Sequence, residues 1–157
     1  MKTLIMLVLI ASIAFGFEVT GGIGPAVVTE VGEAPAFPIC AGLEISTEIS
    51  GRFSIELRGI GATWEDAVGA EARVGLGVAG IGIGYQLDRS LVVSLGGGLG
   101  TYTRPGVESA PGFYGILDYE LNRYQHAQIF LVNTNPTGGS YDGRDPWLFG
   151  VLFGWRI

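Results

Sequence analysis

The last eleven residues of the chain alternate strictly between two kinds of side chain, and this stretch constrains the fold more than any other. One set is apolar and mostly aromatic: Trp147, Phe149, Val151, Phe153, Trp155 and Ile157. The other set is rich in glycine and ends in a charge: Leu148, Gly150, Leu152, Gly154 and Arg156. Because side chains alternate faces along a β-strand, the stretch predicts a strand with one wholly apolar face. Such a face either packs under a second sheet or points at lipid in a transmembrane barrel.

The start of the chain has the pattern of an export signal. A basic start precedes an apolar run, and small residues at Ala14 and Gly16 mark a cleavage site after Gly16. The run is too short for a membrane-spanning helix, which argues against a membrane anchor. We therefore expect a signal peptide over residues 1–16 and a single domain over residues 17–157.

The rest of the chain divides into apolar or alternating segments separated by breaks that are alternately short and long. The expected strands cover residues 17–28, 37–48, 52–61, 70–86, 91–103, 111–121, 126–133 and 147–157. Membrane barrels join an even number of antiparallel strands by short turns at one end and longer loops at the other. The sequence therefore predicts an all-β, eight-stranded antiparallel up-and-down transmembrane barrel, in which the first and last strands pair.

Two local choices decide how the strands pair. We expect a three-residue turn at residues 49–51, which places Glu44 opposite Glu56 and keeps polar residues opposite polar ones, and we reject a two-residue turn because it would mix the faces. The large apolar residues lie at even-numbered positions before residues 79–80 and at odd-numbered positions after them, which indicates either a bulge or an extra turn. We favour the bulge, because a ninth strand would leave the ends of a closed antiparallel barrel on opposite sides.

The small face of the strands predicts what fills the barrel. The chain has 27 glycines in 157 residues, more than twice the usual share of about 7%. Glycine makes room for longer neighbours in a narrow lumen, where charges have to be paired or hydrated. We expect an ion network there that acts as a plug rather than a gate or ion path, and assign to it Glu44, Glu56, Arg58, Glu71 and Arg73.

Aromatic residues gather toward the ends of the expected strands, as in the interfacial girdles of membrane barrels. The aromatics expected at the membrane interface are Trp64, Tyr102, Tyr119, Trp147 and Trp155. The single cysteine, Cys40, excludes an intramolecular disulfide and is expected to be a small core or wall residue rather than a nucleophile. The net charge of −6 argues against nucleic acid as a partner, and no motif indicates a cofactor or a metal.

The final strand resembles the C-terminal assembly signal of bacterial outer-membrane barrels, carried here by Phe153, Trp155 and Ile157. Residues 17–157 as a whole resemble the small outer-membrane proteins of the OmpA membrane-domain and OmpX type. The resemblance implies a monomer in the bacterial outer membrane, inserted by the outer-membrane assembly machinery, in contact with outer-membrane lipid and lipopolysaccharide. It also implies a non-enzymatic role in envelope integrity or surface interaction.

Two other functions stay open from the sequence. The stretch from Arg123 to His126 resembles part of the lipid A deacylases, which implies a catalytic His126, although Gln128 stands at the position of the nucleophile. Ser140, with Asp142 or Asp145, is the available substitute. The remaining alternative is a soluble periplasmic barrel that turns its large apolar face inward and carries an apolar ligand.

Overall fold

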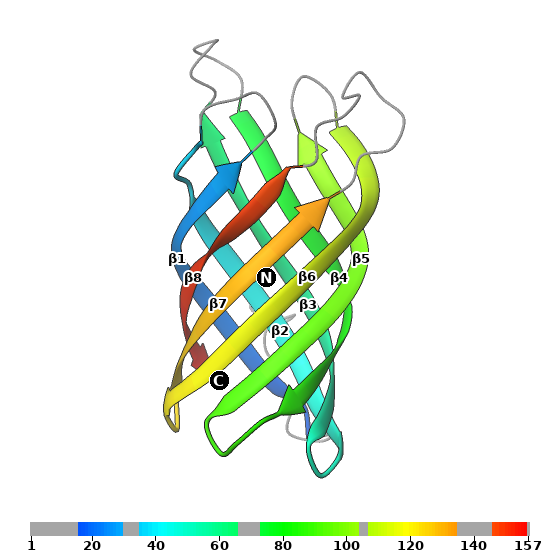
Figure 1. The fold of residues 1–157 in the computed structure, drawn as a ribbon, viewed down its shortest axis with the longest axis vertical. Helices are drawn as coiled ribbons and strands as arrows, with labels where there is room; N and C mark the ends of the chain where they lie inside the picture. The colour runs from blue at the N-terminus through cyan, green and yellow to red at the C-terminus, as the bar shows by residue number, and fades with distance from the viewer. Residues whose placement is uncertain (1–15, 30–34, 66–72, 104–106, 135–145, 157) are drawn as a thin grey trace, which may run out of the picture.

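The structure, a computed structural model, describes residues 16–29, 35–65, 73–103, 107–134 and 146–156. It contains eight strands: β1 (Glu18–Thr29), β2 (Ile39–Ser50), β3 (Phe53–Glu65), β4 (Arg73–Gln86), β5 (Leu91–Thr103), β6 (Val107–Asn122), β7 (Gln125–Thr134) and β8 (Trp147–Arg156). Each strand pairs antiparallel with the next, and β1 pairs with β8, so the sheet closes on itself (Figure 1). The predicted eight-stranded barrel is confirmed. Among the described residues, no helix is long and apolar enough to cross a membrane.

Three short hairpin turns lie together at one end of the barrel (Figure 1). They are formed by Gly51–Arg52, Leu87–Ser90 and Arg123–Tyr124. We call this the hairpin end and the opposite end, where β1 ends and β2 begins, the loop end. The hairpin turns follow the predicted short breaks.

The outer face of the barrel carries most of the large apolar side chains. Ile81, midway along β4, is 65% exposed, and similarly exposed residues occur on the outward parity of the other strands. The parity of β7, ambiguous in the sequence, is settled by burial: His126, Gln128 and Phe130 point inward, whereas Ile129 points outward. Large apolar side chains therefore surround the wall, as expected of a strand face in contact with lipid.

The β2–β3 hairpin differs from the predicted pairing by two register positions. Glu44 lies opposite Arg58 rather than Glu56. The turn has two residues, Gly51–Arg52, and its glycine has a φ of 52°, a conformation that glycine adopts without strain. A two-residue turn alone would place polar residues of β2 opposite apolar residues of β3. A bulge at Ile49 shifts the register by one residue, so that polar residues again lie opposite polar ones. The observed register also replaces a pair of like charges with a pair of opposite charges.

Strand β4 contains no bulge, so that prediction is wrong. Its ladders with β3 and β5 run without a register shift through residues 79–80. Instead, Val74, Leu76 and Val78 point into the barrel, whereas Ile81 points outward. The apolar parity changes because the interior itself becomes apolar toward the loop end, while small residues take the outward positions of β4 there.

The interior thus has two layers along the barrel axis. The apolar layer, toward the loop end, includes Val28, Cys40, Ile60, Leu76, Val78, Tyr102, Phe130, Val132, Leu148 and Leu152. The polar layer, toward the hairpin end, consists of Glu44, Glu56, Arg58, Asp118, His126 and Gln128. The expectation of glycines and charges along the whole lumen therefore holds only for the half nearer the hairpins.

Tyr114 lies at the boundary between the two layers, and glycines make room for its ring. A Cβ atom added at Gly96 would lie 2.3 Å from the Tyr114 hydroxyl and from the ring carbon that carries it. A Cβ atom at Gly82 would also lie 2.3 Å from this hydroxyl. The guanidinium carbon of Arg58 is 5.9 Å from the centroid of the ring, so Tyr114 covers the polar layer from the apolar side.

Replacing Gly96 with alanine is expected to lower the free energy of unfolding by about 1–3 kcal/mol, the usual cost of overpacking an interior. The reason is the collision between the new methyl group and the ring of Tyr114. The matched control is Gly59→Ala, because a Cβ atom there has no neighbour within 4 Å. Urea unfolding in lipid vesicles measures both variants. Equal stability of the two would show that Tyr114 does not pack on Gly96.

Candidate functional site: a charge network inside the barrel

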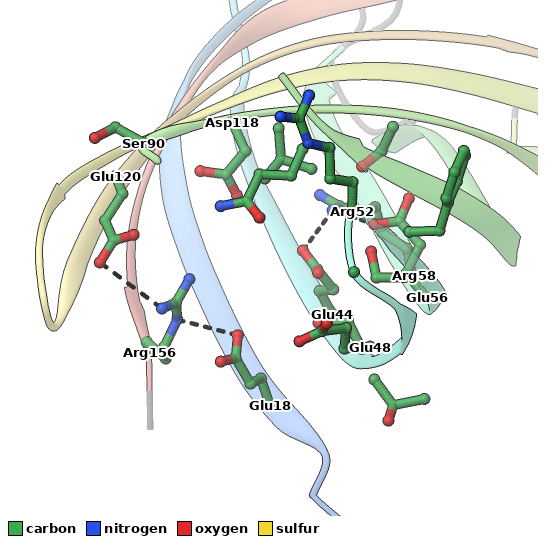
Figure 2. A pocket seen from close by; sticks show the side chains of 18 of the residues that line it. Glu18, Glu44, Glu48, Arg52, Glu56, Arg58, Ser90, Asp118, Glu120 and Arg156 are labelled. Atoms are coloured by element: carbon green, nitrogen blue, oxygen red, sulfur yellow. Dashed lines mark hydrogen bonds and ion pairs between the residues drawn. The ribbon is translucent and has the colours of Figure 1, made fainter. Parts of the chain in front are cut away.

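Arg58 is the centre of the polar layer. Its Nη2 atom donates to the carboxylate of Glu44 on β2 and, at 2.8 Å, to Oε2 of Glu56 on its own strand. Its Nη1 atom donates to Oε1 of Gln128 on β7 at 3.2 Å. Glu56 and Arg58 share the inward face because they are two residues apart on β3. Figure 2 shows the guanidinium of Arg58 between the two carboxylates. One buried cation is thus held by acceptors from three strands.

The network continues from Gln128 to the single histidine of the chain. Nε2 of Gln128 donates to Oδ2 of Asp118 at 2.6 Å, and Nδ1 of His126 lies 2.9 Å from the same oxygen. An ionised carboxylate only accepts hydrogen bonds, so the network assigns the proton of a neutral His126 to Nδ1. Nε2 of His126 is then left as a hydrogen-bond acceptor.

A vestibule leads from the hairpin end to this network. It is an open cavity of about 330 Å³, lined among others by Glu48, Arg52 and Arg58. At its mouth, Nε of Arg156 lies 3.3 Å from Glu18, and Nη1 lies 3.8 Å from Glu120 (Figure 2). Solvent from the hairpin end therefore reaches the polar layer.

Toward the loop end the lumen is filled with side chains. Phe130, Val132, Leu148 and Leu152 are all buried there. Packed apolar side chains offer no hydrogen bonds to a hydrated ion, so this layer opposes its passage. Among the described residues, no group of three or more His, Cys, Asp or Glu side chains is placed to hold a metal ion. The described side chains therefore pair the charges of the lumen with one another and place an apolar layer between them and the loop end.

The structure brings together three of the five residues predicted for the ion network, Glu44, Glu56 and Arg58. Glu71 lies outside the described residues. Arg73 was assigned to the network wrongly: it occupies the first position of β4, and Gly80, the partner of Arg58, is seven residues further along that strand. At about 3.3 Å per residue, this places its backbone about 23 Å from the network.

Three residues of the network, Asp118, His126 and Gln128, were not assigned to it from the sequence. Asp118 and Gln128 are directly opposite in the β6–β7 ladder, so correct pairing of these strands would have identified them. The sequence of β7 conceals its inward face, because apolar residues occur on both parities.

The predicted interface aromatics divide between the two faces of the wall. Tyr119, Trp147 and Trp155 are exposed on the outside, and Trp155 shares that face with Phe153 of the predicted assembly signal. Ile157 lies outside the described residues. Tyr102 is only 2% exposed and belongs to the apolar layer, so its assignment to the interface is wrong. Trp64 is partly buried and packs against the same interior cluster. Tyr102 and Trp64 occupy inward-facing positions of their strands near the loop end, where the interior of the barrel is apolar.

His126 does not face the lipid that a lipid A deacylase would act on. Its side chain lies inside the barrel, two residues after the Arg123–Tyr124 turn at the hairpin end. Gln128 is hydrogen-bonded to Asp118 and supplies no hydroxyl nucleophile. The substitutes Ser140, Asp142 and Asp145 lie outside the described residues. The described geometry therefore gives an acyl chain in the membrane no access to the imidazole.

Several solved structures share this fold. The structure of Ail, the attachment invasion locus protein of Yersinia pestis, matches with a TM-score of 0.62 and 13% identity, covering 90% of this chain and 97% of Ail. Neisserial surface protein A matches with a TM-score of 0.58 and 13% identity, covering 90% of this chain and 96% of that protein. The N-terminal barrel domain of Pseudomonas aeruginosa OprF matches with a TM-score of 0.55 and 12% identity, covering 90% of this chain and 97% of the domain. No protein-family model and no curated protein sequence matches the chain. The chain thus has the fold of the small eight-stranded outer-membrane barrels.

Proposed function

We propose that this barrel is an integral protein of the bacterial outer membrane, exported by its signal peptide, with a role in envelope integrity or surface interaction. The observation that carries the proposal is the apolar outer face. Large exposed side chains such as Ile39, Ile81, Leu95 and Ile129 occur on neighbouring and on opposite strands. Exposed apolar surface of this extent, closed around a barrel, is stable in hydrocarbon and a liability in water.

The arrangement of the interior argues against a soluble carrier of apolar ligands. Such a carrier needs its large apolar face around an internal cavity. Here the apolar half of the lumen is occupied by the protein's own side chains, and the vestibule in the other half is lined mainly by charged and polar residues. The charged and polar lining of the vestibule does not match an apolar ligand.

The same arrangement supports a non-conducting barrel. An eight-stranded barrel has little space beyond what its own side chains occupy. The polar layer fixes Arg58 in place, and the apolar layer closes the lumen beyond it. We therefore assign the function to the outside of the barrel, where lipid, lipopolysaccharide and other molecules of the cell surface are the expected partners.

Structural neighbours lend support to a surface role. Ail is an attachment invasion locus protein, and it has also been solved with the heparin analogue sucrose octasulfate. Neisserial surface protein A is named for its location. By this analogy of fold, we propose that the protein acts as a monomer, inserted by the outer-membrane assembly machinery, and presents its loop end to the outside.

The proposal is tested by membrane fractionation followed by electrophoresis of boiled and unboiled samples in SDS. A closed transmembrane barrel is expected in the outer-membrane fraction, and its mobility should change on heating because the barrel resists SDS until it unfolds. Planar-bilayer recordings of the same preparation should show no channel current. Recovery of the protein in the periplasmic extract, with no heat-dependent mobility, would instead support the soluble barrel.

A further inference from the structure

A second, much smaller cavity lies beside the polar layer and is lined by residues of β1, β2, β3 and β7. Its volume, for the centre of a water molecule, is about 10 Å³, and it is lined among others by Thr20, Gly42, Arg58 and His126. Three residues of this lining each have one buried side-chain atom without a hydrogen-bond partner among the described residues: Oγ1 of Thr20, Nε of Arg58 and Nε2 of His126. Thr20, Arg58 and His126 are 6%, 3% and 5% exposed. Buried polar atoms of this kind normally have a partner in the protein or in ordered water.

The imidazole of His126 lies against the neighbouring strand β8, which offers Nε2 no hydrogen-bond donor. A Cβ atom added at Gly154 of β8 would lie 2.0 Å from Nε2 of His126, so the ring lies directly over this glycine. Asp118 occupies Nδ1, which leaves Nε2 with a lone pair. The hydroxyl of Thr20 both donates and accepts. One acceptor and one hydroxyl thus line the same small cavity.

The size and charge of the cavity decide which ligand fits. About 10–15 Å³ of such volume holds one water molecule, provided that the site offers it two or more polar partners. Arg58 and Glu44 both line the cavity and are paired with each other, so their opposite charges compensate and this pair does not call for an ion in the cavity. A neutral molecule of the size of water, able to donate and accept hydrogen bonds, fits both conditions.

We propose that this cavity is a binding site for one water molecule that links β1 to the charge network. The water donates to Nε2 of His126 and accepts the hydroxyl proton of Thr20. The hydrogen-bonded chain then runs from Thr20 through the water, His126, Asp118 and Gln128 to Arg58. Because β8 lies between β1 and β7, the water joins the two strands that flank β8 and reinforces the closure between the first and last strands.

The test uses the full mature barrel in lipid nanodiscs with ¹⁵N-labelled histidine. Since the chain contains one histidine, every imidazole signal belongs to His126. In the unmodified protein we expect the Nδ1–H tautomer and a nuclear Overhauser effect between a bound water and the imidazole ring protons. Absence of this water signal in the unmodified protein would overturn the proposal, whatever the variants do.

Two variants of Thr20 separate a role of its hydroxyl from a role of its shape. Thr20→Val keeps the shape without the hydroxyl, and we expect it to lose the water signal and to move the Nε2 resonance downfield. Thr20→Ser keeps the hydroxyl and should retain both the water signal and the original position of the Nε2 resonance. An unchanged water signal in Thr20→Val would overturn the assignment of Thr20. Backbone amide spectra of both variants verify that the barrel is folded.

Discussion

Replacing Arg58 with methionine is expected to lower the free energy of unfolding by about 3–5 kcal/mol, the usual cost of removing one partner from a buried ion pair. Methionine has a similar length but carries no charge. The side chains of Glu44 and Glu56 are only 12% and 2% exposed, so both carboxylates lose their common counter-charge where water compensates little. The measurement is the urea midpoint of the barrel folded in lipid vesicles.

Two controls show whether the loss comes from these carboxylates. Arg52→Met removes an arginine from an exposed turn, where substitutions usually change stability by less than about 0.5 kcal/mol. Adding Glu44→Gln and Glu56→Gln to Arg58→Met should recover stability, because the uncompensated charges are then gone. A midpoint that is unchanged in Arg58→Met would mean that the network does not stabilise the barrel.

Replacing Ile81 with arginine is expected to lower the free energy of unfolding in a bilayer by about 2–4 kcal/mol, the cost of a cation on the lipid face near the midplane. Ile81 is midway along β4 and faces outward, so its substitute would lie in hydrocarbon. The same urea titration in vesicles measures this loss.

The matched substitution is Ile49→Arg, at the exposed bulge beside the β2–β3 turn. Its cost should be about 0–1 kcal/mol, because a charge near the interface remains hydrated. If both arginine variants are equally mild, the outward face of β4 does not lie in hydrocarbon, and the proposed membrane location is wrong. A large cost at position 81 alone supports it.

The sequence contains enough information to predict the number and order of the strands. Alternation in residues 147–157 and the strict sequence of short and long breaks both follow from a barrel wall with two different faces. This information is lost where the two faces become alike. In β4, Val74 and Val78 point inward while Ile81 points outward, so apolar character no longer identifies the lipid side. In β4, the position of a residue along the barrel axis decides whether its apolar side chain points inward or outward. No local sequence pattern encodes this position.

The candidate site was predictable where charges interrupt an apolar strand. Glu44, Glu56 and Arg58 follow this rule, because charged side chains on the lipid face of such strands are costly. Their partners depend on pairing between strands, which is less accessible from the sequence. A bulge at Ile49 set the register of Glu44, and the ambiguous parity of β7 concealed Gln128.

The division of the interior into a polar and an apolar half also gives the chain two unique chemical reporters, one in each half. Its one histidine lies in the half that borders the vestibule, and its one cysteine, Cys40, is 1% exposed in the packed half. Reaction of the thiol with a water-soluble reagent therefore requires the packed half to open. Reaction of the imidazole requires only local movement next to the vestibule. The ratio of the two rates distinguishes local breathing of the barrel from its unfolding.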